Sequence, residues 1–515
     1  MNKRNVLLLA TLMLVVQPAC ASDYGALKGE VDSYAPSPLY LSLTGGAATK
    51  KTPSPPVAGA DDFAAAAQRL RDLAAQWELT LQRPEAAAAF IVPRADLLLS
   101  LTGAVEDPAV AGQALVDGFS LQTLETLTLL RNPTIRTKQA EARAAVEVFG
   151  QAEQIDAVLR RYASLSATSM AGSGMGVAQD FPFPAVLALK GQIVGEEVRA
   201  ARETLEAARR DAVAAARTAY WELSYSGQAA EITARMIDLL ENLDRSVASR
   251  YEAGKTSFQD LVRIRIEREK AREELRTLAE ERKNREAEIR SLLALPPEIA
   301  VGIPAIREDG TPLPAQAKLE SLALARRQEL RAADAMVGRM ERMLEMVETM
   351  TYPGFDLGLN PVPRGVIAAA AADSAMGGVA GSSGTAAAPP RRPFFAADEA
   401  YVREIRQRIA ALKSEREAVR AQTLVDVRNA WFAADRARRE EALYAAKVLG
   451  LSQSALESSL QGYASGSVAF ADLLESYKGW LENNLARRRA RVDIGITRSG
   501  LEAAVGVANL EGTAE

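Results

Sequence analysis

The residues of this chain that could take part in chemistry are carboxylates, and they recur in one repeated motif. The pattern Y-x-x-G-x-x-x-F-x-D-L occurs at 251–261 and again at 463–473. It places Asp260 and Asp472 at the same position, and Glu475 follows three residues after Asp472. Carboxylates can exchange protons with a substrate or attract cations. Two carboxylates could in principle serve a glycosidase. Their spacing here follows helix turns instead, so the sequence does not favour such an enzyme.

Other residue types exclude whole classes of chemistry. The chain has no histidine, so imidazole metal sites and Ser-His-Asp triads cannot form. Its single cysteine, Cys20, excludes an intrachain disulfide and a thiolate cluster. With 62 Lys+Arg against 66 Asp+Glu, net charge does not favour nucleic acid as a partner. The composition therefore favours a protein that is not an enzyme.

The first residues have the features of an export signal. Lys3 and Arg4 precede an apolar run of 11 residues, 6–16, which is too short to cross a bilayer as a helix but suits a secretory signal. Two processing sites fit. Cleavage after Ala19-Cys20-Ala21 would remove 1–21, whereas cleavage before Cys20 would leave a lipoprotein acylated there. No later run reaches 18 apolar residues. Any membrane passage would therefore use strands.

The distribution of proline predicts long helices. Residues 185–295 and 394–515 contain none, and proline breaks helix interiors. A helix from about Gln192 to Arg250 would be roughly 90 Å long at 1.5 Å per residue, which implies coiled-coil packing. Apolar residues follow a helical stripe in both stretches: Met236, Leu239, Leu240, Leu243 and Val247 in the first, and Phe470, Leu473, Leu474, Tyr477 and Leu481 in the second.

The two proline-free stretches are copies of one unit. The turn motifs are offset by 212 residues, and R-T-A-Y-W at 217–221 matches R-N-A-W-F at 428–432. Upstream, Arg131–Arg136 matches Arg326–Arg331 with an offset of 195. The second copy thus carries 17 more residues between these matches (212 − 195), and the low-complexity tract 361–392 is the candidate insert.

Each copy is expected to contain a helix, an irregular segment with possible strands, a long helix, a tight turn and a returning helix. Gly254 and Gly466 suit the positive φ that ends an outgoing helix. Ser257 and Asp260 form a capping-box pattern for the first returning helix. In the second copy Ala469 stands where the capping serine would be.

An exported, duplicated chain of helical hairpins turning at this motif resembles the TolC family of outer-membrane efflux proteins. The segment 119–133, ending in Asn132-Pro133, is similar to the family's first helix. The segment 493–506, with L-E-A-A-V-G at its end, is similar to the last. The likeness covers about Phe119 to Gly506.

The resemblance implies a mainly α fold: two tandem repeats of long helical hairpins forming an α-barrel, with a small shared antiparallel β-barrel, in a homotrimer. The strands would contact outer-membrane lipid, and the helices would lie in the periplasm as a coiled-coil tunnel. The channel would do no chemistry, use no cofactor and no metal, and passively conduct substrates delivered by a periplasmic adaptor and an inner-membrane pump. The alternative is a periplasmic coiled-coil scaffold or adaptor without a pore, because the strand signals are weak. They comprise 162–183, the alternation Phe355, Leu357, Leu359, and Phe394 with Phe395 as a returning strand or aromatic girdle.

The resemblance also assigns roles at the hairpin turns. It implies a periplasmic gate with an acidic ring of Asp472 and Glu475, with Asp260 as the first-copy counterpart and Tyr463 in closed-state contacts. The family has a basic residue where this chain has Val468, which puts the same closing network in doubt. The residues expected to contact the adaptor are Tyr251, Gly254, Ser257, Gly466 and Ser467.

Simpler interpretations stand beside these roles. An acid in the first turn of a helix is favoured by the helix dipole, by about 0.3–1 kcal/mol, without any further function. Tyr251, Tyr463 and their partner phenylalanines in the motif are expected to pack at the turn. The arginine-rich run 487–491 is expected to be a solvated helix face with acidic neighbours.

The sequence predicts the following organisation: a signal peptide (1–21), an N-terminal extension and linker with a helix at 61–81 (22–118), a first repeat (119–300), a second repeat that contains the insert (301–506), and a tail (507–515).

Overall fold

The computed structural model describes residues 89–148, 183–254, 256–304, 312–350 and 393–510. The expected signal and Cys20, the helix at 61–81 and the insert at 361–392 lie outside these ranges. So do the expected strand residues 162–182 and 355–359. All the described residues belong to one compact unit, Ala65–Glu515.

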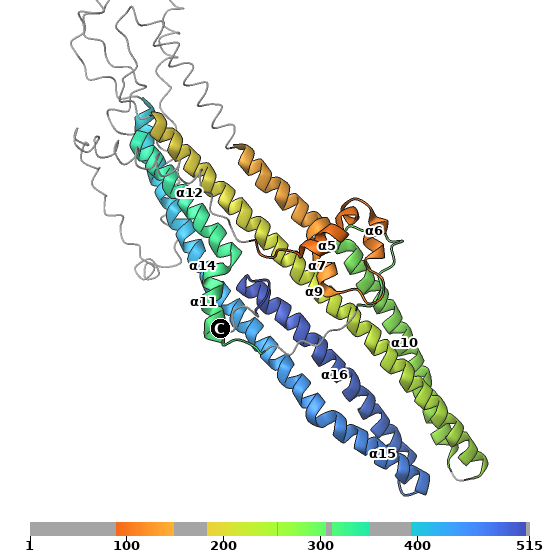
Figure 1. Cartoon of the computed structure of the whole chain (residues 1–515). Helices are drawn as coiled ribbons and strands as arrows, with labels where there is room; N and C mark the ends of the chain where they lie inside the picture. Colours follow the sequence, from red (N-terminus) through yellow and green to blue (C-terminus); the bar gives the residue numbers. More distant parts are fainter. Residues whose placement is uncertain (1–88, 149–182, 255, 305–311, 351–392, 511–515) are drawn as a thin grey trace, which may run out of the picture. The chain divides into compact units, whose positions relative to one another are not determined.

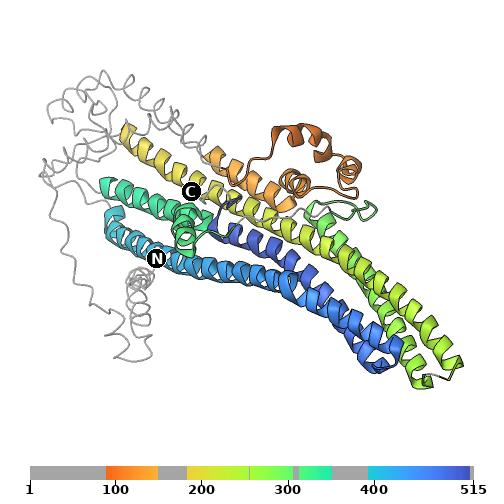
Figure 2. The same ribbon diagram turned by 60° about the horizontal axis from the view of Figure 1, so that its bottom comes forward.

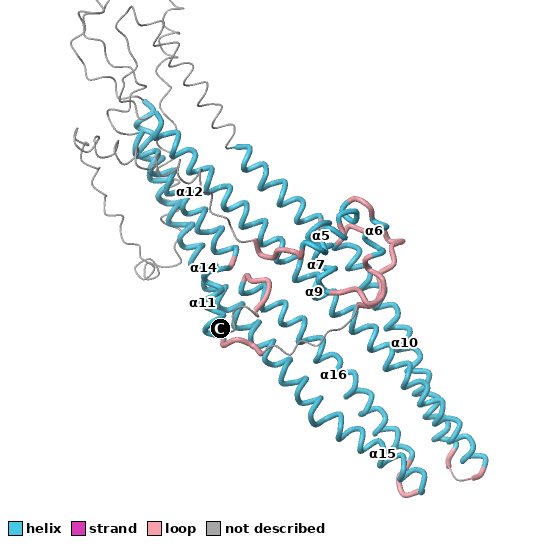
Figure 3. Tube along the Cα trace, in the orientation of Figure 1, coloured by secondary structure: helices cyan, strands magenta, loops and turns pink. Residues whose placement is uncertain are grey.

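Every regular element in the described ranges is helical, and Figure 3 draws no strand there. The helices with defined bounds are α5 (Ala95–Ser100), the 3₁₀ turn η1 (Thr102–Val105), α6 (Pro108–Gln113), α7 (Leu121–Arg131), α9 (Phe183–Glu252), α10 (Phe258–Leu292), α11 (Gln316–Arg326), α12 (Gln328–Met350), α14 (Pro393–Leu443), the π-helical turn η2 (Tyr444–Val448), α15 (Leu449–Ser465) and α16 (Phe470–Val505). A further helix covers 133–148. No helix in these ranges has an apolar stretch long enough to cross a membrane.

The long helix predicted from the proline-free stretch is confirmed and is longer than expected. α9 has 70 residues, which corresponds to about 105 Å at 1.5 Å per residue. The interpretation of Phe394 and Phe395 as part of a strand was wrong, because both lie in the first turn of α14. Pro393 opens that helix, and proline is favoured at a first helical position, where the missing N–H would have no partner anyway.

The backbone repeats with the offset of 195 that the sequence shows. α7 ends at Arg131, Asn132 is extended (φ −57°, ψ 125°), and the next helix begins at 133. α11 ends at Arg326, Arg327 is extended (φ −63°, ψ 127°), and α12 begins at Gln328. In both copies the N–H of the extended residue donates to the carbonyl four residues earlier, at 2.9 Å. The duplication predicted from the sequence is therefore visible in the backbone.

The helices lie side by side in an order that contacts between elements define. Toward the hairpin turns the order is α10, α9, α16 and then α15, and toward the other end α12 lies between α9 and α14 (Figures 1 and 2). Ion pairs join neighbours along this layer. Arg272 bonds to Glu241 at 2.7 Å between α10 and α9, and Arg489 bonds to Glu222 at 2.9 Å between α16 and α9. We call α9–α10 the first hairpin and α14–α16 the second hairpin.

Part of the expected N-terminal extension packs on the first repeat. Leu101, Ala104, Ala111 and Leu115 are buried in one cluster with residues of α7, α9 and α10. The guanidinium of Arg131 joins these parts, because Nη1 donates to the Ala104 carbonyl at 2.6 Å and Nε donates to the Leu293 carbonyl at 3.0 Å. The α5–α6 region and the end of α10 are thus fastened to the end of α7.

Candidate functional site at the hairpin tips

The first hairpin turns as its sequence predicts. Gly254 has φ +69°, and its N–H donates to the Tyr251 carbonyl at 2.9 Å. A side chain is strained in this left-handed region, so glycine is favoured there. Ser257 caps α10: its Oγ accepts from the Asp260 N–H at 3.2 Å, and the Asp260 carboxylate accepts from the Ser257 N–H at 3.3 Å. The predicted capping box is confirmed.

Asp260 is fully engaged in that cap. Its Oδ2 also accepts from the hydroxyls of Ser257 and Thr256, each at 2.8 Å. Burial raises the pKa of Asp260, but the hydrogen bonds from Ser257 and Thr256 outweigh burial, so the pKa lies below its usual value. All these partners belong to Asp260's own turn, and the carboxylate reaches nothing in the second hairpin through them.

The second hairpin turns through a Schellman motif. Gly466 has φ +84° and its N–H donates to the Tyr463 carbonyl at 3.2 Å, while the Ser467 N–H donates to the Gly462 carbonyl at 2.8 Å. Gly462 also lies close to Val468, because a Cβ at 462 would be 2.3 Å from Val468 Cγ2. Val468, the departure from the family's basic residue, is thus a packing residue of the turn.

Asp472 and Glu475 differ from Asp260 in having no partner. Ala469 precedes α16 without a side-chain cap, and Asp472 lies in the first turn of that helix. Both acids are exposed. Neither carboxylate has a hydrogen-bond or ion-pair partner in the part of the chain that the structure describes. Two uncompensated negative charges are therefore available at the second tip.

The aromatic pair of the motif packs across both turns but is buried at only one. The ring centroids of Tyr251 and Phe258 are 6.0 Å apart, and those of Tyr463 and Phe470 are 5.7 Å apart. The first pair is 43% and 60% exposed, whereas the second is 8% and 4% exposed. The expected packing role of these rings is confirmed, and the two tips present different surfaces.

Arg250 is the residue of this site that sequence reasoning missed. Its Cζ lies 4.5 Å from the centroid of the Tyr463 ring, a cation–π distance, and its Nη1 donates to the Tyr463 carbonyl at 2.9 Å. This contact joins the end of α9 to the end of α15. Two polar atoms of this residue pair, Arg250 Nε and the Tyr463 hydroxyl oxygen, are buried without a hydrogen-bond partner among the described residues.

One signal in the sequence could have pointed to Arg250. With the offset of 212, Arg250 corresponds to Gly462. The copies thus differ immediately before the shared tyrosine, where one has a cation and the other has no side chain. The structure gives each difference a reason, since Arg250 reaches Tyr463 and Gly462 leaves space for Val468.

An apolar core behind the turns holds the two hairpins together. It contains side chains from all four helices that meet there: Met236, Leu240, Leu243 and Val247 of α9, Leu261 and Ile264 of α10, Leu456 and Tyr463 of α15, and Phe470, Leu473, Leu474 and Tyr477 of α16. The stripes predicted from the sequence are mostly part of this core. Burying apolar area at about 25 cal/mol per Å² fixes the tips against each other.

Buried ion pairs fasten the helices farther from the tips. Arg217 of α9 bonds to Glu125 of α7 at 2.6 Å and also to Glu502 of α16, and all three residues are less than 10% exposed. Burial raises the pKa of Glu502, although the positive charge of Arg217 acts to lower it.

The arginine-rich run 487–491 has the acidic neighbours expected of it, because Arg489 pairs with Glu222 and Asp493.

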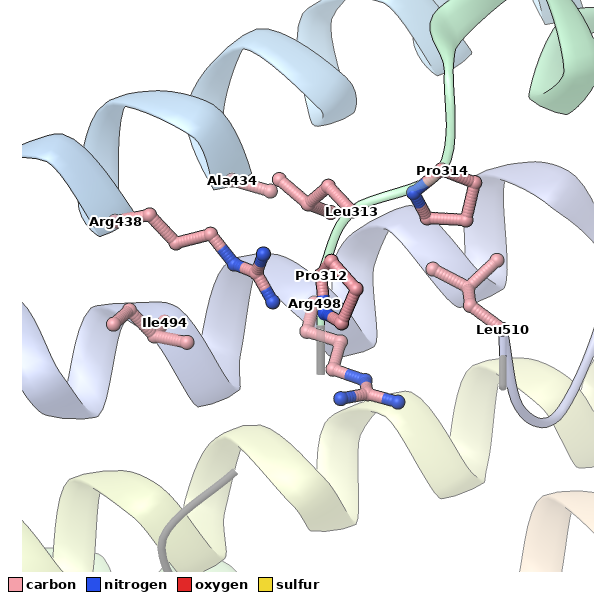
Figure 4. Close-up of a pocket in the computed structure, with 8 residues that line it drawn as sticks. All are labelled: Pro312, Leu313, Pro314, Ala434, Arg438, Ile494, Arg498 and Leu510. Carbon is pink, nitrogen blue, oxygen red and sulfur yellow. The ribbon is translucent and has the colours of Figure 1, made fainter. Parts of the chain in front are cut away.

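The described residues include a depression of about 610 Å³ that is open to solvent and lies between the η1 turn and the end of α7, lined by Val105, Glu106, Leu129, Leu130, Arg131, Arg136 and Gln139 rather than by residues of the tips. Figure 4 shows a pocket between the segment before α11, α14, α16 and Leu510. Its volume of about 10 Å³ has room for one water molecule at most. No group of three or more carboxylates in these ranges could hold a metal ion. The features that set the tips apart are therefore surface charge and contacts between helices.

Comparison with known proteins identifies the fold. Neither a protein-family model nor a curated protein matches the sequence. Among solved structures, a membrane protein from Pseudomonas aeruginosa aligns with a TM-score of 0.56 and 15% identity, over 76% of this chain and 95% of that one. The outer membrane protein VceC of Vibrio cholerae gives 0.55 and 13%, over 75% and 96%. The MtrE outer membrane channel of Neisseria gonorrhoeae, in its open state, gives 0.54 and 15%, over 75% and 89%.

These likenesses cover nearly the whole of each solved chain, so the match extends far beyond a single hairpin. At such identities they show the fold alone. The resemblance predicted from the turn motifs is confirmed at that level: this chain has the fold of solved outer-membrane channel structures.

Proposed function

We propose that this chain is the outer-membrane channel of a tripartite efflux or secretion system. In this role it works as a homotrimer, does no catalysis, and passively conducts substrates that an inner-membrane pump and a periplasmic adaptor deliver. The observation that carries the proposal is the match to solved channel structures over three quarters of the chain. The outer membrane is the location that goes with this role, with the helices in the periplasm.

The edges of the helical layer support assembly into a ring. At one edge Phe258, Val262 and Ile266 of α10 are exposed, spaced four residues apart along the helix. At the other edge Val425, Phe432, Leu443 and Leu451 of α14 and α15 are exposed. Apolar side chains at both edges of an open layer suit a closed ring, in which one edge of each copy packs on the opposite edge of the next.

The second tip supplies the acidic ring of the proposed gate. Asp472 and Glu475 are exposed and have no partner in the described ranges, so three copies would place six carboxylates around one mouth. Such a ring attracts cations and repels itself unless counter-ions or partners intervene. Tyr463 belongs to the same gate through Arg250. We assign Asp260 a secondary role there because its cap already occupies the carboxylate.

The remaining site assignments depend on the same role. We propose that the adaptor contacts the turn residues Tyr251, Gly254, Ser257, Gly466 and Ser467, all of which are exposed. Cys20 is the proposed lipidation site if the signal is cleaved before it. The repeats 119–300 and 301–506, the strands and the β-barrel of the family complete the proposed architecture.

The proposal is tested on the full chain expressed with its own signal in an outer-membrane host. We expect membrane extraction to need detergent, chemical cross-linking to give trimers, and the purified protein to conduct ions in planar bilayers. Monomers released by salt or alkali, with no conductance, would instead support the scaffold without a pore.

The edge assignment has its own test. Ile266→Asp on α10 should weaken the trimer without unfolding the chain, because Ile266 is exposed in the protomer. Arg276→Ala is the matched control, since it changes an exposed residue of the same helix outside the Phe258–Ile266 stripe. Equal trimer yields from both variants would remove α10 from the interface.

A further inference from the structure

The offset between the two copies changes by one residue within the long helix, between the two pairs of matching segments. R-T-A-Y-W at 217–221 and R-N-A-W-F at 428–432 are offset by 211 residues, whereas the turn motifs at 251–261 and 463–473 are offset by 212. The second copy therefore has one extra residue between Phe432 and Tyr463. An insertion of one residue in an α-helix would turn every later side chain by about 100°.

Burial in α9 and α14 supports the offset of 211 in the part of the chain before the extra residue, on the side away from the tips. Four positions of α9 are buried together with the four positions of α14 that lie 211 residues later: Ala212, Ala216, Leu223 and Ser226 with Thr423, Val427, Ala434 and Ala437. An offset of 212 would pair Ala216 with Arg428 and Leu223 with Asp435, neither of which is buried. The upper parts of the two helices thus pack in the same register.

Below this point the tips agree with the offset of 212. Gly254 and Gly466 both have positive φ, and the rings of Tyr251 and Tyr463 each pack on the phenylalanine seven residues later. The extra residue therefore lies between Phe432 and Tyr463.

The π-helical turn η2 lies between those levels. It spans Tyr444–Val448 and is the single π-turn among the described residues, whereas α9 is α-helical throughout the corresponding stretch. A π-turn holds one more residue than an α-turn, so it absorbs an insertion and leaves the faces on either side in phase. The change of offset in the sequence and the π-turn in the backbone independently indicate one inserted residue in the second copy.

We infer that η2 is a one-residue insertion in the second copy and that it forms the hinge about which the second tip moves relative to the first. As a motion that opens or closes a passage, this rests on the proposed channel function. The insertion itself does not, because it is deduced from register and backbone alone.

Within one protomer the surroundings of η2 leave it weakly held, and in the proposed ring Leu443 and Leu451 beside it belong to the edge that packs on the next copy. None of its side chains is buried, and Leu443 and Leu451 on either side are 50% and 72% exposed. Gly450 lies within the next turn, and no atom lies within 4 Å of where its Cβ would be. A π-turn and a glycine are both recognised causes of helix bending, and here they lie within seven residues.

Anchors above and below the turn define what moves. Above it, α14 is tied to the start of α12 by the pair of Arg416 with Asp334, and Asp426 is bonded to Arg327 at 2.8 Å. Below it, α15 is tied to α16, because the hydroxyls of Ser459 and Ser476 are 2.8 Å apart. α15 and the start of α16 therefore move together, and their movement breaks the Arg250–Tyr463 contact, the ion pair of Lys478 with Glu267 and part of the apolar core behind the turns.

The test compares deletion of Ala446, inside η2, with deletion of Ala234 at the matching level of α9. Loss of Ala446 should convert η2 to α-helix, keep both registers and leave the melting temperature unchanged. Loss of Ala234 should turn Met236, Leu240 and Leu243 away from the core behind the tips and lower the melting temperature sharply. A deletion of Ala446 as damaging as that of Ala234 would overturn the insertion.

Hydrogen exchange on the purified full chain then tests the hinge. Amides of 441–455 should exchange roughly 10-fold faster in the wild type than in the Ala446 deletion, because the π-turn opens locally. Equal rates in the two proteins would overturn the hinge. Conductance is measured separately: a wild-type chain that forms no pore would refute the channel function and leave the exchange result standing, whereas a conducting chain should gate less readily after deletion of Ala446.

Discussion

The guanidinium of Arg250 lies 4.5 Å from the centre of the Tyr463 ring and donates a hydrogen bond of 2.9 Å to the same residue's carbonyl oxygen. These residues are 213 positions apart and belong to different copies of the duplicated unit. Each contact is worth about 1 kcal/mol, so the two add modestly to the apolar core that holds the tips together. A contact of this strength is compatible with the gate proposed at the tips.

We expect Arg250→Ala to separate the tips. The variant loses both contacts with Tyr463, so the melting temperature should fall modestly and the channel should leak more ions at rest. Arg250→Lys should retain part of the effect, because an ammonium can also lie over the ring. Arg245→Ala is the control, since Arg245 is exposed on the same helix and bonds only to its own turn. Resting conductance equal to that of the control would contradict the role of the tip contact.

The exposed acids of the second tip should govern ion selectivity. Asp472→Ala combined with Glu475→Ala should lower the preference for cations in single-channel recordings, because it removes the unpaired charges at the proposed mouth. Asp260→Ala is the comparison. It breaks the cap of α10, so it should cost about 1 kcal/mol of stability and change selectivity less. Selectivity unaffected by the double substitution would refute the acidic ring.

Acid should weaken the junction between α9 and α12 through Glu329. Burial raises the pKa of Glu329, but its bonds to Arg210, at 2.5 and 2.7 Å, outweigh burial and bring the pKa to about 2. A depressed pKa stabilises the fold above the unfolded value of 4.5, and this stabilisation is lost as the pH falls toward about 2. Glu329→Gln should therefore lower the melting temperature at pH 7, and the difference from wild type should shrink toward about pH 3. The exposed Glu274→Gln should show no such trend, and a constant difference for Glu329→Gln would exclude the linkage.

Two glycines of α16 should respond to alanine in opposite directions. At Gly495 a Cβ would lie 2.1 Å from the ring of Trp221, so Gly495→Ala should force α16 and α9 apart and cost about 1–3 kcal/mol. At Gly500 no atom lies within 4 Å, so Gly500→Ala should raise stability by roughly 0.5–1 kcal/mol through helix propensity. Thermal unfolding monitored by circular dichroism measures both, and equal shifts would mean that α9 and α16 do not approach each other at Trp221.

Local features of this fold could be predicted from the sequence, because each depends on a few neighbouring residues. The positive φ of Gly254 and Gly466, the capping box of Ser257 and Asp260, and the continuity of α9 are of this kind. Phe394 and Phe395 were misinterpreted because two aromatic residues after a proline are compatible with a strand as well as a helix. Only the long helical pattern downstream of Pro393 decides between them.

Contacts between distant residues could not be predicted in the same way. Arg217 pairs with Glu125 and Glu502, which are 92 and 285 residues away, and a chain rich in arginine and glutamate offers many equivalent pairings. Arg250 posed the same problem, although its mismatch with Gly462 was visible in the aligned copies. Duplication makes such positions detectable, because different residues at matching positions of the two copies indicate different structural roles.

The neighbours of α9 have a consequence for how freely the sequence can vary. α9 contacts four other helices of the same chain, α7, α10, α12 and α16, at different levels along its length. α10, half as long, buries only Leu261, Ile264, Leu278 and Ile289 among its described side chains. Random substitution should therefore disturb the folding of the protomer at fewer positions of α10 than of α9, while the exposed stripe Phe258, Val262 and Ile266 of α10 is constrained by the proposed assembly instead.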